Sequence, residues 1–152
     1  MVNGVNRVIL AVKDMEAAKT YYKTLLGAEF YSADWTGEPF GIQVAISWNA
    51  GIELCAPIVG KENVCFLTPV LHDRGETILG VVFNVENADV GLSRATSMGI
   101  GTVNSVDYSQ AEIDAHLDGL FTRYKEYFLN TSAEIGYGLT LGQFECDPSL
   151  TV

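Results

Sequence analysis

The side chains that most often do chemistry are few in this sequence and form no familiar catalytic or metal-binding pattern. The three cysteines, Cys55, Cys65 and Cys146, are odd in number and have no CxxC spacing, which argues against a disulfide framework and a zinc cluster. His72 and His116 have no ligand-type residue at suitable spacing on a strand, so we interpret both as exposed or packed side chains. No serine–histidine–aspartate or cysteine–histidine set stands out.

The composition is that of a compact, acidic protein. The 152 residues carry a net charge of −10, and 48% of them are hydrophobic. An acidic surface repels phosphate backbones and anionic lipid, so we expect neither nucleic acid nor a membrane as a partner. No apolar run approaches the roughly 18 residues of a membrane span, and the N-terminal VILAV run is too short for a signal peptide. We therefore expect a single domain in a reduced, cytoplasmic setting, with no cofactor.

The elements that would position a site are organised around one stretch, Arg7 to Phe30. Val5 to Val12 is a β-branched run that predicts a buried strand. Asp14 then stands where a helix N-cap belongs, and Gly27 stands where the helix should end. Between them, apolar residues recur at helical spacing, at Ala18, Tyr21, Tyr22, Leu25 and Leu26.

A weaker copy of this stretch follows at Gly80 to Val103. When Arg7 is set against Gly80, Val8 falls on Val81 and Asp14 falls on Asn87, a second possible N-cap. The order of strand, cap, helix and terminal glycine therefore occurs twice, which indicates one βα-based module written twice.

The remaining pattern predicts further strands, loops and one extra helix. In the first half we expect strands at Ala28–Ser32, Ile42–Trp48 and Ile52–Ala56, a loop at Asp34–Pro39, and a connector with a short strand at Val64–Leu67. In the second half we expect strands at Thr102–Val106, Tyr124–Leu129 and Tyr137–Phe144, a helix from Gln110 to Asp118 behind the capping box Ser109–Glu112, and a turn at Asn130–Gly136.

The predicted class is α+β, with helices against mostly antiparallel or mixed sheets. Within the single domain we expect a first module at 1–58, a connector at 59–77, a second module at 78–146 and a loose tail at 147–152.

Together these residues resemble the vicinal oxygen chelate superfamily, which includes glyoxalases, bleomycin resistance proteins and extradiol dioxygenases. The resemblance lies in V-x-L-x-V-x-D at Val8–Asp14, A-x-x-Y-Y-x-x-x-L-G at Ala18–Gly27 and I-E-L at Ile52–Leu54. It implies two βαβββ modules whose curved sheets surround a shared cavity, with the helices outside.

The resemblance also implies a divalent metal held by four side chains, one from the first and one from the last strand of each module. Those positions fall on Arg7, Glu53, Gly80 and Thr140. Only Glu53 is a ligand type, since arginine stays protonated and glycine has no side-chain donor. We therefore expect no metal site here.

Strand alternation then suggests which polar residues face the implied cavity. If Arg7 faces inward, so do Ile9 and Ala11, whereas Val8, Leu10 and Val12 pack beneath the helix. The inward polar residues, which we take as candidate ligand-binding residues, are Arg7, Glu53, Asn84 and Thr140. We further expect an ion pair between Arg7 and Glu53 and a flap over the cavity formed by Trp35.

These expectations leave several functions open. The favoured one is a metal-free protein of the glyoxalase or bleomycin resistance type that holds a small organic molecule, with a homodimer expected from the resemblance. The main alternative is a metal-independent isomerase or lyase with Glu53 as base and Arg7 as anion stabiliser. Weaker alternatives are a metal-dependent enzyme of the glyoxalase or dioxygenase type and a protein whose dimer surface matters more than its pocket.

Overall fold

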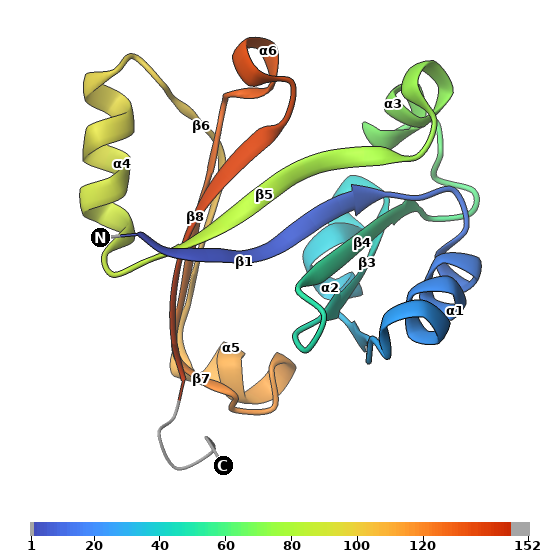
Figure 1. Ribbon diagram of the computed structural model, residues 1–152, viewed down its shortest axis with the longest axis horizontal. Helices are drawn as coiled ribbons and strands as arrows, with labels where there is room; N and C mark the ends of the chain where they lie inside the picture. Colours follow the sequence, from blue (N-terminus) through green and yellow to red (C-terminus); the bar gives the residue numbers. More distant parts are fainter. Residues whose placement is uncertain (1, 147–152) are drawn as a thin grey trace. The chain divides into compact units, whose positions relative to one another are not determined.

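The computed structural model describes residues 2–146, which form two compact units (Figure 1). The first unit comprises Arg7–Gly80, and the second comprises residues 2–6 together with residues 81–146. Two strands run from one unit into the other: β1 (Val2–Ala11) and β5 (Thr77–Val85). The loose tail predicted at 147–152 lies outside the described residues. Among residues 2–146, no helix has both the length and the apolar character that crossing a membrane requires.

The first unit has the element order βαβββ, with short helices inserted around the last two strands. After β1 come α1 (Met15–Leu26), β2 (Tyr31–Ser32), α2 (Asp34–Gly37), the 3-10 helix η1 (Glu38–Phe40), β3 (Ile42–Ser47), β4 (Ile52–Pro57) and α3 (Leu67–Arg74). Its strands lie in the order β2-β3-β4-β1. β1 pairs with β4 in parallel, and β3 pairs with β4 as the predicted antiparallel hairpin.

Local signals set both ends of α1. The Asp14 side chain accepts a hydrogen bond from the Ala17 N–H at 3.0 Å, which satisfies one of the unpaired donors of the first turn. Gly27 ends the helix in the left-handed region at φ 68°, where a side chain would be strained. The cap and the stop predicted from sequence are therefore confirmed.

α1 packs on one face of the first unit's sheet. The core there is made of alternate strand residues and helix residues, namely Val12, Met15, Ala45, Ile52, Leu54 and Ala56, with Leu10, Ala18 and Tyr22 packed against them. Leu10 and Val12 thus pack with the helix as predicted, and the residues between them on β1 point to the opposite face.

Three segments differ from the sequence prediction in type, and the strand predicted at Ala28–Ser32 is shorter than expected, because only Tyr31 and Ser32 are in β2. The predicted loop at Asp34–Pro39 is mostly helical, as α2 and η1, and the short strand predicted at Val64–Leu67 is absent because α3 begins at Leu67. The predicted turn at Asn130–Gly136 contains a four-residue helix, α6 (Ser132–Ile135). α2, α3 and α6 begin without a side-chain N-cap, which is the sequence signal that identified the start of α1.

The second unit repeats the order βαβββ. It contains β5, α4 (Ala88–Ser97), β6 (Thr102–Tyr108), α5 (Gln110–His116), β7 (Phe121–Leu129), α6 and β8 (Gly138–Cys146). The strand order is β5-β8-β7-β6, and β6, β7 and β8 pair antiparallel. Asn87 caps α4 through the Val90 N–H, and Ser109 with Glu112 forms the predicted capping box of α5. The prediction of an α+β chain built from two βαβββ modules is confirmed.

Polar contacts attach α4 to β7. The Asp89 carboxylate on α4 accepts hydrogen bonds from Lys125 Nζ at 2.7 Å and from the Tyr127 hydroxyl at 2.6 Å. The face of β7 that carries Lys125 and Tyr127 therefore lies toward α4. Tyr124, Glu126 and Phe128 alternate with them and occupy the other face.

Candidate functional site

Arg7 and Glu53 lie on the face of the first unit's sheet opposite α1. Glu53 lies between Ile52 and Leu54 on β4, and both of those residues belong to the core beneath α1. Strand alternation therefore directs Glu53 to the other face, which is also the face of its paired neighbour Ile9 on β1. Arg7 shares this face because it lies two residues before Ile9.

The two side chains form a buried ion pair, as the sequence suggested. Arg7 Nε donates to Glu53 Oε2 at 2.6 Å, and the residues are only 2% and 9% exposed, respectively. Charge-assisted hydrogen bonds of this kind are among the strongest in proteins, but both charges must first lose their water. Burying either charge without a partner would cost far more free energy, so each charge reduces the cost of burying the other.

Two further side chains complete what we call the Arg7 cluster: Arg7, Glu53, Cys55 and Trp48. The Cys55 thiol lies 3.8 Å from Glu53 Oε1, and the Trp48 ring centroid lies 5.5 Å from the guanidinium carbon of Arg7. Burial raises the pKa of the Cys55 thiol well above its ordinary value, and the Glu53 charge raises it further. Cys55 therefore stays a neutral thiol at physiological pH and is a poor nucleophile.

The four positions that the resemblance assigns to a metal do not fit one. Arg7 is a cation bound to Glu53, so it competes with a metal for the carboxylate. Gly80 offers no side-chain donor and Thr140 offers only a hydroxyl. Across residues 2–146, no three histidine, cysteine, aspartate or glutamate side chains come together in a group able to hold a metal ion.

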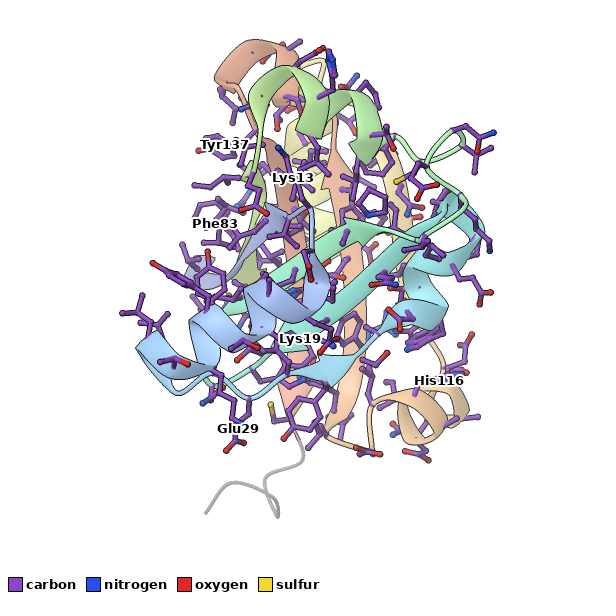
Figure 2. The ribbon with its side chains drawn as sticks, turned by 90° about the vertical axis from the view of Figure 1, so that its right-hand side faces the viewer. Lys13, Lys19, Glu29, Phe83, His116 and Tyr137 are labelled. Carbon is purple, nitrogen blue, oxygen red and sulfur yellow. The ribbon has the colours of Figure 1, made fainter. Side chains whose placement is uncertain are left out.

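Neither histidine belongs to the Arg7 cluster. His72 lies at the exposed end of α3, where its ring Nδ1 is 2.7 Å from the neighbouring Asp73 carboxylate. His116 is the last residue of α5 in the second unit (Figure 2). Both histidines are exposed, which agrees with their interpretation from the sequence as exposed or packed side chains.

The other two candidate residues, Asn84 and Thr140, belong to the second unit. Asn84 is half-buried on β5, and Thr140 is 2% exposed on β8, paired with Phe128 of β7. Their predicted roles in ligand binding stay predictions.

Sequence reasoning missed a second buried carboxylate, Glu126 on β7. It is 3% exposed, and the Tyr124 hydroxyl donates to its Oε2 at 3.2 Å. Glu126 pairs with Gly142 across the strands, on the face opposite α4 that also carries Thr140. The available signal was the alternation in Tyr-Lys-Glu-Tyr, where Lys125 and Glu126 must point to opposite faces.

The predicted flap residue, Trp35, lies in the short helix α2 rather than in a loop. α2 packs against β3 beside Val44, because a side chain at Gly37 would lie within 2.7 Å of Val44. Val44 pairs directly with Cys55, so α2 covers the same face of the sheet as the Arg7 cluster. Whether Trp35 acts as a flap stays a prediction.

This chain resembles known proteins in structure but not detectably in sequence. No protein-family model matches the chain, and no curated protein sequence matches it. Among solved structures, methylmalonyl-CoA epimerase from Mycobacterium tuberculosis matches with a TM-score of 0.68 and 22% identity, covering 98% of this chain and 91% of that chain.

Two other solved structures give the same result. A variant of Streptomyces coelicolor methylmalonyl-CoA epimerase in complex with 2-nitronate-propionyl-CoA matches with a TM-score of 0.68 and 15% identity, covering 94% of this chain and 98% of that chain. A hypothetical protein from Bacillus halodurans matches with a TM-score of 0.65 and 16% identity, covering 91% and 92%. The chain therefore has the fold of these proteins, the paired βαβββ fold of the vicinal oxygen chelate type.

Proposed function

We propose that this protein binds a small organic molecule carrying a carboxylate or carbonyl group, and that Arg7 is the polar anchor. The observation that carries the proposal is the buried Arg7–Glu53 ion pair. A hydrophobic pair of similar volume would stabilise the fold equally well or better, so stability alone does not explain why two charges are kept there. In this proposal Glu53 orients the guanidinium, whose planar fork suits bidentate contact with a carboxylate.

The same geometry favours binding over catalysis by Glu53. Its Oε2 is bound by Arg7, and its Oε1 faces the Cys55 thiol. A general base must accept a proton from substrate, and Glu53 would have to break its contact with Arg7 or displace Cys55 to do so. A carboxylate that orients a binding arginine needs no such rearrangement.

Coenzyme A esters are the ligands to test first. The solved structures with the same fold include methylmalonyl-CoA epimerases in complex with methylmalonyl-CoA and with 2-nitronate-propionyl-CoA. Methylmalonyl-CoA carries the free carboxylate that the proposal requires, and propionyl-CoA is the matched ester without it.

The binding prediction is tested by isothermal titration calorimetry with these two esters. We expect methylmalonyl-CoA to bind more tightly than propionyl-CoA, and Arg7→Leu to weaken its binding at least about tenfold, because a charge-assisted contact is lost. Arg74→Leu removes an exposed arginine of the same unit and should leave affinity unchanged. Arg7→Lys tests the planar fork if the leucine variant does not fold. Equal affinity in the Arg7 and Arg74 variants would refute the proposal.

The alternative is a metal-independent isomerase or lyase with Glu53 as base and Arg7 as anion stabiliser, and the epimerases among the solved structures with the same fold support testing it. Glu53→Gln separates the two functions, because a binder keeps its affinity whereas an enzyme loses turnover and still binds. Exchange of the methylmalonyl α-proton in D2O, followed by NMR in the presence of a chelator, is the measurement. Exchange by the native protein that Glu53→Gln abolishes would establish the enzyme and overturn the binding role.

A further inference from the structure

The first unit contains a pocket that lies away from the Arg7 cluster. It has a volume of about 520 Å³, which is within the usual range for small-molecule sites, and it lies along α1 and the ends of β1 and β5. Its lining includes Tyr21 and Tyr22 of α1, Glu76 just before β5, and Ile78 on β5. No residue of the Arg7 cluster lines it, so a ligand here would be independent of the function proposed above.

The charged groups that line this pocket are all acidic. They are Asp14 and Glu76, and the lining contains no lysine, arginine or histidine. Glu76 is held in place because its Oε1 accepts the backbone N–H of Lys13 at 2.8 Å. The side chains of Lys13 and Lys19, both labelled in Figure 2, do not line the pocket, and Lys19 Nζ is paired with Glu16 at 2.9 Å. The side chains that line the pocket therefore give it a negative potential.

Aromatic rings supply the second feature. Tyr21 and Tyr22 meet edge to face, with ring centroids 5.3 Å apart, and the Ile78 side chain adds apolar surface. The Tyr22 pKa is raised, first by partial burial and then by the nearby Tyr21 and Glu76. This places the Tyr22 hydroxyl in the field of the Glu76 carboxylate, an environment that disfavours a second anion and favours a cation.

We infer that this pocket binds a small organic ammonium ion. The cation would lie against the tyrosine rings, within reach of the Glu76 carboxylate, while its alkyl groups contact Ile78. An anionic ligand would be repelled by both carboxylates, and a neutral apolar ligand would gain no attraction from the Glu76 charge. An ammonium ion is the one of these three classes that satisfies both the rings and the charge.

The test uses choline and its neutral isostere, 3,3-dimethylbutan-1-ol, which has the same shape without the charge. Each is titrated into the ¹⁵N-labelled protein while amide NMR shifts are followed, with the Lys13 amide as the reporter beside Glu76. We expect choline to change the chemical shift of this amide saturably. The neutral isostere should bind at least about fivefold more weakly.

Two variants locate the effect. Glu76→Gln keeps an oxygen for the Lys13 N–H but removes the charge, and should weaken choline binding about fivefold or more. Glu16→Gln removes an exposed charge of α1 that does not line the pocket, and it should leave binding unchanged. Tyr22→Phe keeps the ring and should preserve most of the affinity. Equal binding of choline and the alcohol, equal effects of the two glutamine variants, or no saturable shift would each overturn the inference.

Discussion

Arg7 and Glu53 are two opposite charges that the folded chain almost completely removes from water. Because they are 2% and 9% exposed, their attraction is strong, but so is the cost of losing either partner. Glu53 has Arg7 on one oxygen and only a thiol on the other. The pair should therefore behave as a coupled unit in mutational experiments.

We expect Arg7→Leu to lower the free energy of unfolding by about 3 kcal/mol, because Glu53 is left as a buried charge with only Cys55 beside it. Glu53→Leu should lower the free energy of unfolding much less when it is made in the Arg7→Leu variant than when it is made in the native protein. A double-mutant cycle by urea denaturation should give a coupling energy of about 1–3 kcal/mol. Strictly additive losses would show that the pair is not coupled.

At the level of single residues, the Arg7–Glu53 ion pair could be predicted from the sequence, but the buried carboxylate of Glu126 could not. Arg7 and Glu53 were found because the resemblance places two of its four metal positions on them, and strand alternation then suggested which of their neighbours share their face. Glu126 was missed because β7 mixes polar and aromatic residues on both faces, so alternation alone does not mark one face as buried. Its burial depends on how β7 pairs with β8, which a single sequence does not reveal.

Among the elements, α4 is attached to its sheet by charge as well as by apolar packing. Lys125 and Tyr127 lower the pKa of Asp89 through their hydrogen bonds, the lysine having the larger effect. A carboxylate with a lowered pKa stabilises the fold above its ordinary value of 3.8, and this contribution is lost as pH falls through the folded-state pKa. The attachment of α4 should therefore weaken in acid.

Asp89→Asn tests this attachment. At about pH 6 the variant should be less stable than the native protein, and the difference should shrink as pH falls through the lowered folded-state pKa of Asp89, because the native carboxylate then becomes protonated as well. Because Asp89 is largely exposed, the difference should be small, so chemical denaturation at closely spaced pH values is the suitable measurement. Asp114→Asn on α5, outside this network, is the control. A stability difference that does not depend on pH would contradict the prediction.

Gly37 sets how closely α2 packs on β3. A Cβ at this position would lie 2.5 Å from the carbonyl oxygen of Ile42, which is backbone and cannot move aside cheaply. We expect Gly37→Ala to destabilise the protein by about 1–3 kcal/mol. Gly101→Ala is the matched control, since a Cβ there meets nothing within 4 Å. Equal stability of the two variants in thermal unfolding would show that α2 can shift without cost.

The helices that begin with a side-chain N-cap were predictable and those that begin without one were not, for a physical reason. α1, α4 and α5 each begin with a side chain that caps a free N–H, at Asp14, Asn87 and Ser109. α2, α3 and α6 begin without such a cap, and α2 and α6 are too short for an apolar period to appear. They form because the folded chain around them stabilises their few turns.

For the whole molecule, β1 and β5 matter most because each contributes residues to both compact units. Unfolding of one unit would remove part of a continuous strand from the other. We therefore expect a single cooperative transition, in which the calorimetric enthalpy equals the van't Hoff enthalpy. Two resolved heat-capacity peaks would show that the units unfold independently.

The repetition of the βα-based module could be predicted from the sequence although the two copies share little sequence identity. What repeats is the order of a β-branched strand, a capping residue, a helix and a glycine, and this order is set by backbone chemistry rather than by particular core residues. The arrangement of the strands within each sheet is a property of pairing between distant residues, and it came from the resemblance rather than from any local pattern.

Trp48 gives the Arg7 cluster an optical signal of its own. Its indole ring lies 5.5 Å from the Arg7 guanidinium, and the only other tryptophan, Trp35, also belongs to the first unit. Indole emission responds to nearby charge and to water, so a ligand arriving at Arg7 should change the wavelength or intensity of tryptophan fluorescence. The chain thus carries an intrinsic reporter, and libraries of unlabelled compounds can be screened against the native protein without a dye.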